Sequence, residues 1–341
     1  MPDVIGSVKS ADSVVEPVNR SGDLQVTMAS GARPKRALAR DQPPEEQGSP
    51  WTNSRVLQSI VRAGSEAVAM SVYATPRHIV GLDDCYFYHT ADVPGHGVVH
   101  GEWDLRGHEH EYLGNVPLAG KRVLEIGAAS GGLSFWMERQ GAAVTALDIS
   151  PDHGRDLVSF PGFERDEVRW RESINRLNNS WWLQWRLLGS RARKVYASVY
   201  DVPAELGAVD IATFGSVLLH LRDPFAGLES ALRNTSEAAI VTDVYPGPNR
   251  LVRALNRAYF SPQLHNWLGR PTMQWLPDVR KRLEDAWWLI HPKAVVRMVE
   301  VLGFPDTTIS YHRQQSKNGP VLLYTVVARR MAAAVPPRAR G

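Results

Sequence analysis

The chain has 341 residues, of which 43% are hydrophobic, with a formal net charge of +3 and one cysteine. This length allows one large domain with attachments, or two domains. The single thiol, Cys85, excludes a disulfide within the chain and favours a reducing compartment. No apolar run approaches the roughly 20 residues that span a bilayer, and the N-terminus lacks a hydrophobic signal core. We therefore expect a cytoplasmic protein with no membrane partner.

The net positive charge comes from the C-terminal end of the chain. Of the 39 basic and 36 acidic side chains, 6 and 7 lie in residues 1–50, and four arginines lie in residues 329–341. The body, residues 51–328, therefore carries 29 groups of each sign. A charge-balanced body attracts a polyanion weakly, so nucleic acid is not an expected partner. Residues 1–50 contain no aromatic side chain, and we expect disordered tails there and at 331–341.

Residues 51–115 precede the first predicted strand of the core. We expect a helical lead-in that folds over one edge of a sheet, and it contains Trp51 and Trp103. His108 and His110 have a spacing that occurs in metal sites, but no third ligand is indicated. We therefore expect no metal in this protein.

The most informative segment is residues 121–132, with the sequence KRVLEIGAASGG. It predicts an apolar strand that ends in glycine and turns on small residues into a helix. Gly127 and Gly131 let backbone approach a ligand closely, because a Cβ would fill the ligand's space or forbid the turn's dihedral angles. The next apolar strand ends in Asp148, where an acid accepts hydrogen bonds from two ribose hydroxyls. Together these features predict a nucleoside cofactor, and an ordinary strand, turn and helix without a ligand is the alternative.

The spacing of this segment distinguishes between cofactors. A dinucleotide fingerprint requires a glycine two residues after Gly127, and this chain has Ala129 there. Glu125 would repel a diphosphate but suits a ligand that carries an ammonium and a sulfonium. The run Glu125-x-Gly127-x-x-x-Gly131 closely resembles motif I of the class I S-adenosylmethionine (SAM) methyltransferases, and Asp148 resembles their ribose-binding acid.

The resemblance implies SAM as the cofactor and a role for specific residues. Asp201 would accept a hydrogen bond from the adenine amino group and the amide of Val202 would face the ring, with a turn cap by Asp201 as the alternative. Arg106 would bind the methionine carboxylate through two parallel hydrogen bonds, with a surface ion pair to Asp104 or Glu102 as the alternative. The expected cofactor-binding residues are Arg106, Glu125, Gly127, Ala128, Gly131, Asp148, Ile149, Asp201, Val202, Gly215 and Ser216.

The order of predicted elements indicates an α/β fold. Strands alternate with helical stretches, which implies a parallel sheet with helices on both faces. Two final strands, separated by the polar turn at 314–319, would close the sheet as an antiparallel pair within residues 306–330. We expect a doubly wound, mostly parallel seven-stranded Rossmann-like methyltransferase sheet with its core at 116–245 and helical, aromatic lid insertions. The predicted strands lie near 121–127, 143–148, 194–200, 209–215, 237–243, 307–313 and 321–329.

One insertion, residues 150–192, is far longer than a single crossover helix needs. We expect it to contain a helix that begins at Asn179 or Ser180, since both are helix-capping residue types. That helix would carry Trp181, Trp182 and Trp185.

A second insertion, residues 246–305, is expected to form a substrate lid. Trp288 and His291, three residues apart, would share one face of a helical turn. Aromatic and histidine side chains are frequent in this insertion and predict an apolar or aromatic pocket. They are Tyr259, Phe260, His265, Trp267, Trp275, Trp287, Trp288 and His291.

His220 is the first candidate for a catalytic base. It lies in residues 210–224, after a buried strand, and an imidazole is half-protonated near neutral pH. This segment resembles the corresponding one in several methyltransferases, including enzymes that carboxymethylate a tRNA wobble uridine. A structural histidine behind the site is the alternative. His291 is the second catalytic candidate, and Tyr88 would be considered after it.

These observations predict a SAM-dependent methyltransferase that acts on O, N or C of a small, aromatic metabolite. The alternative is a tRNA-modifying enzyme of the wobble-uridine type, which the segment around His220 and the arginines of the C-terminal tail favour. The neutral body and the lack of an appended RNA-binding module argue against it. A protein that binds SAM without catalysis is a third hypothesis.

Overall fold

The computed structural model describes residues 71–154, 156–158, 160–162, 166–247, 270–280 and 285–331. The predicted N-terminal tail, Trp51, nearly all of the C-terminal tail and the aromatic residues from Tyr259 to Trp267 lie outside the described residues. Within those residues, no helix combines the length and apolar character that crossing a membrane requires.

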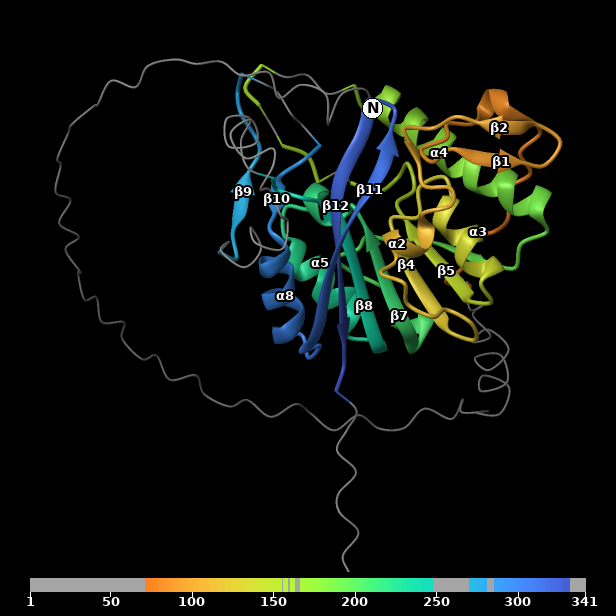
Figure 1. Ribbon diagram of the computed structural model, residues 1–341. Helices are drawn as coiled ribbons and strands as arrows, with labels where there is room; N and C mark the ends of the chain where they lie inside the picture. The colour runs from red at the N-terminus through yellow and green to blue at the C-terminus, as the bar shows by residue number, and fades with distance from the viewer. Residues whose placement is uncertain are drawn as a thin grey trace, which may run out of the picture. The chain divides into compact units, whose positions relative to one another are not determined.

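An eight-stranded sheet forms the centre of the described structure (Figure 1). Five parallel strands and a closing antiparallel pair confirm the predicted architecture. The parallel strands are β4 (Arg122–Ile126), β5 (Ala143–Asp148), β6 (Arg193–Tyr196), β7 (Val209–Gly215) and β8 (Thr235–Val244). The closing pair is β11 (Asp306–Ser316) and β12 (Gly319–Arg329), and the strand order is β3-β11-β12-β8-β7-β4-β5-β6.

Two details of the sheet differ from the prediction of seven strands. The short strand β3 (Trp103–Asp104), from the lead-in, adds an eighth strand by pairing with the end of β11. Strand β6 ends at Tyr196 and not near residue 200, because only four of its residues pair with β5. The chain therefore leaves the sheet several residues before Asp201.

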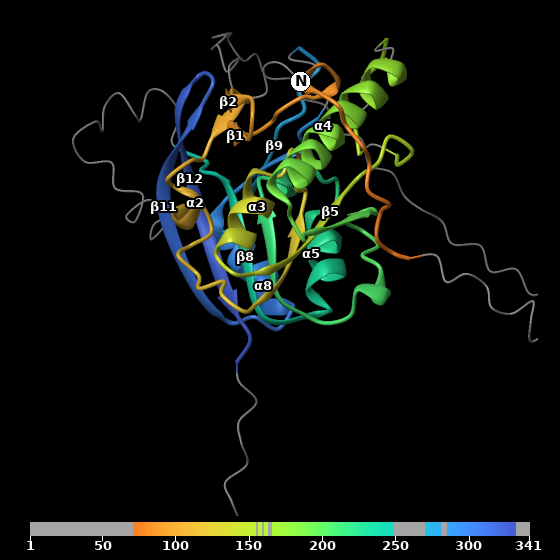
Figure 2. The ribbon, with the colours of Figure 1, turned by 90° about the vertical axis from the view of Figure 1, so that its right-hand side faces the viewer.

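Helices cover both faces of the sheet, as predicted (Figures 1 and 2). Alternate residues of β4 point to opposite faces, as the period of a strand dictates. Val123 belongs to a core with residues of α3 (Gly132–Arg139) and α4 (Glu167–Leu188). Leu124 belongs to a second core with residues of α5 (Pro224–Leu232) and α8 (Pro292–Val301).

Helix α4 begins twelve residues earlier than predicted, at Glu167, because the Asp166 side chain accepts a hydrogen bond from the amide of Arg169. Asn179 and Ser180 are buried within the helix. Their side chains donate hydrogen bonds to backbone carbonyl oxygens of the lead-in, at residues 84 and 86. The helix carries three tryptophans that contact one another edge to face, Trp181, Trp182 and Trp185.

The described part of the lead-in, residues 71–115, is mostly irregular, so the prediction of a helical segment is wrong there. It contains η1 (Leu82–Asp84), the hairpin of β1 (Ala91–Val93) and β2 (Gly97–Val99), and the single turn α2 (Glu109–Tyr112). Gly95 and Gly97 adopt positive φ angles that suit the hairpin turn. Arg176 and Arg186 of α4 fix the segment by donating to its carbonyl oxygens.

The described part of the second insertion also differs from the prediction. Strands β9 (Met273–Trp275) and β10 (Trp288–Ile290) form an antiparallel hairpin, and α8 follows it directly. Trp288 is therefore in a strand, whereas His291 is the N-cap of α8. The two side chains do not share a helical turn.

Candidate functional site

The connection from β4 to α3 is a tight turn that glycine makes possible. Gly127 and Gly131 have φ angles of 74° and 92°, which residues other than glycine rarely adopt. A Cβ on Gly127 would lie 2.6 Å from Val217, and one on Gly131 would lie 2.7 Å from the ring of Trp181. The packing of the protein itself therefore requires both glycines.

Asp148, the last residue of β5, holds this turn in place. Its Oδ2 accepts a hydrogen bond from the amide of Ala129 at 2.7 Å, and its Oδ1 accepts one from the amide of Ile149 at 2.8 Å. Ala129 has a φ of 48°, a left-handed conformation that is uncommon for alanine. Such strained residues gather at functional sites, where the surrounding structure maintains them. The Asp148 side chain remains 13% exposed, so a ligand can still reach it.

Glu125 lies near the end of β4 and is 3% exposed. Ser134 donates a hydrogen bond to its carboxyl group, and the indole Nε1 of Trp181 donates to Ser134 Oγ at 3.1 Å. Burial raises the pKa of Glu125 to about 7. A positively charged ligand group beside Glu125 would favour its ionised form and would be attracted to it.

The lead-in, the β4–α3 segment and strands β7, β8 and β12 enclose a cavity at the carboxyl ends of β4, β7 and β8. The amides of Tyr88 and His89, in the lead-in, both donate to Ser130 Oγ and so fix that segment against the glycine-rich turn. Tyr112 and Ser216 share a hydrogen bond of 3.3 Å, and Ser216 also has a positive φ, 52°. Polar and glycine residues that line the cavity include Tyr88, His89, Tyr112, Glu125, Gly127 and Ser216.

Most predicted cofactor residues therefore come together at one edge of the sheet. Gly215 ends β7 and lines the same cavity. Ala128 is fully buried in the turn, and Ile149 follows Asp148. Open α/β sheets bind their ligands at this edge.

Two predicted residues have other partners, and a third is exposed. The Arg106 guanidinium donates to both carboxylate oxygens of Asp104 at 2.8 Å and to Asp92 at 3.0 Å, which is the ion-pair alternative. The amide of Val202 donates to Ser230 Oγ at 2.8 Å and is therefore engaged within the protein. Asp201 is exposed beyond the end of β6, and its predicted contact with adenine stays a prediction.

The two candidate catalytic histidines have different environments. His220, half-buried in η3 (Leu218–His220), forms a hydrogen bond through Nδ1 with the carbonyl oxygen of Asp285. A carbonyl only accepts, so Nδ1 carries the proton and Nε2 is left as the basic nitrogen. His291 is 4% exposed, and its Nδ1 accepts from the amide of Lys293 at 3.3 Å as the N-cap of α8.

Two buried ionisable side chains were missed from the sequence. Asp243, in β8, is 2% exposed; its Oδ1 accepts from the amide of Val244, and its Oδ2 has no hydrogen-bond partner among the described residues. Burial raises the pKa of Asp243 to about 7. An acid in the apolar run AAIVTDV was a readable signal. Lys194, in the edge strand β6, is buried as well, and nothing in the sequence indicated it.

No family model matches the chain, but curated sequences and solved structures do. The ubiquinone biosynthesis O-methyltransferase of Xanthomonas oryzae pv. oryzae (strain PXO99A) is 29% identical over 193 residues, covering 50% of this chain and 70% of that protein. The enzyme of the same name from Xylella fastidiosa (strain 9a5c) is 54% identical over 37 residues, 11% of this chain and 15% of that protein.

These sequence similarities agree with three features of the structure. They are the turn that contains Glu125 and the two glycines, Asp148 at the end of β5, and the sheet with its closing antiparallel pair. In these features the chain is similar to the class I SAM-dependent methyltransferases.

Solved structures of low similarity were also found. The N-terminal domain of EvdMO1 with S-adenosylhomocysteine (SAH) bound has 17% identity and a TM-score of 0.41, covering 81% of this chain and 97% of that one. Magnesium protoporphyrin IX methyltransferase from Synechocystis PCC 6803, with SAH, has 13% identity and a TM-score of 0.40, covering 80% of this chain and 100% of that one.

Proposed function

We propose that this chain is a SAM-dependent methyltransferase that transfers the methyl group to a hydroxyl oxygen of a small aromatic molecule, with His220 as the general base. The observation that supports this proposal most strongly is the hydrogen bond between His220 Nδ1 and the carbonyl oxygen of Asp285. It leaves Nε2 free to accept a proton from the substrate. A hydroxyl oxygen needs such a base, because its proton must leave as the new bond forms. The matched curated relatives, both named O-methyltransferases, support oxygen over nitrogen or carbon.

Several side chains are suited to hold the donor. Glu125 would attract the ammonium and sulfonium groups, and Asp148 would accept from the ribose hydroxyls while it holds Ala129 in the turn. When bound, SAM supplies an electrophilic methyl group on a positively charged sulfur. The protein then contributes orientation and the exclusion of water, which supply up to roughly 7 to 11 kcal/mol in well-aligned systems.

The proton transfer follows from the tautomer of His220. The acceptor oxygen forms its bond to the methyl carbon while its proton moves to Nε2, and sulfur keeps the electron pair of the broken carbon–sulfur bond. The resulting imidazolium donates from Nδ1 to the carbonyl oxygen of Asp285, which stabilises its positive charge. Because His220 is only half-buried, the proton can then pass to solvent.

The hairpin of β9 and β10 supports an aromatic acceptor. Trp275 is 54% exposed, and its ring contacts those of Trp287 and Trp288 edge to face at 5.5 and 5.2 Å. The amide of Trp287 donates to the carbonyl oxygen of Leu219, so the hairpin is joined to η3 beside His220. The exposed indole ring of Trp275, on a hairpin that is joined to η3, offers a surface on which a planar ring can stack.

An acceptor screen tests this proposal. The protein is incubated with methyl-labelled SAM and, in parallel, with a panel of phenols and catechols, a small-molecule metabolite extract and total RNA. We expect label in an ether of a small aromatic molecule, and much less label with His220→Gln. Label in RNA, or on nitrogen or carbon of a small molecule, would overturn the proposed acceptor while leaving the methyltransferase assignment intact.

A further inference from the structure

Lys194 is a lysine in an unusual position. It is the second residue of the edge strand β6, yet its side chain has no exposed surface. Its Nζ has no hydrogen-bond partner among the described residues. A buried ammonium without hydrogen bonds destabilises a fold, so such a group calls for a functional explanation.

The surroundings of Lys194 connect it to the proposed donor site. Its Nζ lies 3.6 Å from Asp148 Oδ2 and 5.2 Å from the centre of the Trp181 ring. In the sheet, Lys194 is paired with Ala146, which is paired with Glu125, so the three residues form a row on one face. The ammonium therefore lies on the same side of the sheet as two carboxyl groups.

The other charged and titratable groups near Lys194 are few. Tyr196, on the same strand, has its ring centre 6.0 Å from Nζ, and burial raises the pKa of its phenol. Burial lowers the pKa of Lys194, and the Asp148 and Glu125 carboxyl groups oppose that shift. Arg77, from the lead-in, has its guanidinium 5.2 Å from the centre of the Tyr196 ring and adds a little to the lowering of the Lys194 pKa.

A nearby positive charge helps Asp148 to perform its proposed role. Its two oxygens already accept hydrogen bonds from two backbone amides, so ribose hydroxyls can bind only if the carboxylate keeps a fixed orientation. The Lys194 ammonium attracts the carboxylate and restrains that orientation. No hydrogen bond joins Lys194 to Asp148 within 3.5 Å, so the interaction is one of charge at 3.6 Å.

We propose that Lys194 is a positioning residue for SAM binding, whose buried charge keeps Asp148 aligned for the ribose at the expense of stability. It acts on the donor through Asp148. This inference rests on the proposed ribose-binding role of Asp148. It predicts a separation that a purely structural lysine would not show: removing Lys194 weakens binding without weakening the fold.

The first experiment replaces Lys194 with methionine, an apolar side chain of similar length. We expect Lys194→Met to keep or raise the melting temperature and to weaken SAH binding, measured by calorimetry, by about tenfold or more at neutral pH.

Two comparisons test whether Lys194 affects SAH binding through Asp148 or through another residue. In an Asp148→Asn background, Lys194→Met should cause little further loss of affinity. The probe 5′-methylthioadenosine keeps the ribose of SAH but lacks its amino acid, so its affinity should fall by the same factor as that of SAH. Were Lys194 to act through Glu125, the loss would appear with SAH alone.

Two control variants show whether a change in SAH affinity comes from the charge of Lys194. Lys121→Met removes an exposed lysine that pairs with Glu237 at 2.6 Å at the other end of the sheet, and it should leave SAH affinity unchanged. Lys194→Gln keeps a polar end without charge and should reproduce the loss of affinity seen with Lys194→Met. Unchanged affinity in both Lys194 variants, or a loss that persists in the Asp148→Asn background, overturns the proposal. Failure of the wild type to bind SAH would instead overturn the assignment of the donor site.

Discussion

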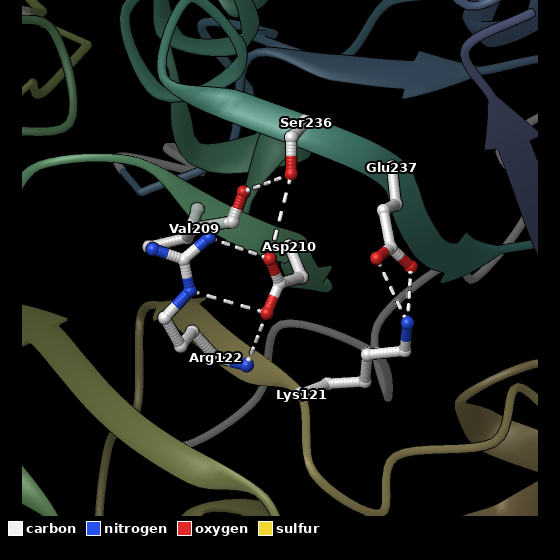
Figure 3. Close-up of polar contacts among 6 residues, drawn as sticks. All are labelled: Lys121, Arg122, Val209, Asp210, Ser236 and Glu237. Carbon is white, nitrogen blue, oxygen red and sulfur yellow. Dashed lines mark hydrogen bonds and ion pairs between the residues drawn. The ribbon is translucent and has the colours of Figure 1, made fainter. Parts of the chain in front are cut away.

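The two ends of the same strands carry charge in opposite ways. At the amino ends of β4, β7 and β8, charged side chains are exposed and paired (Figure 3). Arg122 bonds Asp210 through two nitrogens, with Nη2 to Oδ1 at 2.6 Å and Nε to Oδ2 at 3.2 Å. Lys121 donates to both oxygens of Glu237, at 2.8 and 2.6 Å. These four charged groups are therefore paired within the protein.

At the carboxyl ends of the same three strands, charged side chains are buried and incompletely paired. Glu125 in β4 and Asp243 in β8 are 3% and 2% exposed, and Asp243 has one oxygen without a partner among the described residues. Ser216, just after β7, has a strained backbone. Unsatisfied groups and strain reduce stability and are retained where a ligand completes them. The comparison indicates that one end stabilises the sheet and the other binds.

The pKa values show the same contrast. Hydrogen bonds from Arg122 lower the pKa of Asp210 to about 2, whereas burial raises those of Glu125 and Asp243 to about 7. A lowered pKa gives stability that is present near neutral pH and lost on acidification. A raised pKa gives stability that is present at low pH and lost as the pH rises toward 7. The two ends should therefore respond to pH with opposite sign.

The largest expected effect is on catalysis, from His220→Gln. Loss of the basic Nε2 should slow the chemical step by about 10²-fold or more while SAH affinity changes by no more than a few-fold. The loss should shrink as the pH rises toward the pKa of the acceptor hydroxyl, since an ionised acceptor needs no base. Single-turnover rates across pH measure this. A lowered melting temperature with an unchanged rate would instead make His220 a structural residue.

The next effect, on donor binding, contrasts one aspartate at each end of the sheet. Asp148→Asn should weaken SAH binding by about 1.5 to 3 kcal/mol, the scale of hydrogen bonds to a charged group. Asp210→Asn makes the same chemical change at the amino end and should leave SAH affinity unchanged. Calorimetry on both variants gives the answer. Equal losses in the two variants would break the distinction between the ends.

The sequence predicted the features that depend on neighbouring residues along the chain. The turn from Gly127 to Gly131, the acid Asp148 and a turn before Gly319 all follow from local spacing and glycine. The predicted turn at 314–319 was too long, because β11 and β12 pair into it and leave only two residues between them. His291 also had a local signal: Pro292 follows it, and proline is favoured as the first residue of a helix. That pattern identifies His291 as an N-cap and not as a helical neighbour of Trp288.

The remaining errors involve partners that are distant in sequence. Ser180 has the chemistry of a helix cap, but it lies inside α4 because it bonds a carbonyl oxygen of the lead-in, 94 residues away. The amide of Val202 is taken by Ser230 from α5, 28 residues away. Lys194 resembles any exposed lysine of an edge strand until α4 places Trp181 over it. Composition and spacing do not encode such tertiary contacts.

A smaller effect should appear in stability at the carboxyl end. Asp243→Asn removes a carboxyl group that is buried and partly unsatisfied, so it should raise the melting temperature at about pH 8. At about pH 3, below the ordinary pKa of an aspartate, the wild-type carboxyl is protonated in both the folded and the unfolded protein, and the two proteins should have similar melting temperatures. Thermal unfolding at both pH values checks the sign. A variant that is less stable at pH 8 would show that the Asp243 carboxylate is well satisfied in the folded protein.

The smallest effect is expected at the amino end, from Arg122→Gln. The Arg122 side chain is 55% exposed, and exposed ion pairs contribute little because water and salt screen them. We expect the melting temperature to fall by no more than about 3 °C near neutral pH. Because the pair lowers the pKa of Asp210, this difference should disappear as the pH falls toward about 2 and Asp210 becomes protonated. SAH affinity should be unchanged, since the pair lies at the opposite end of β4 from the glycine-rich turn. Weaker SAH binding by Arg122→Gln would show that the two ends of the strands are coupled, and that the paired charges contribute to the site as well as to the sheet.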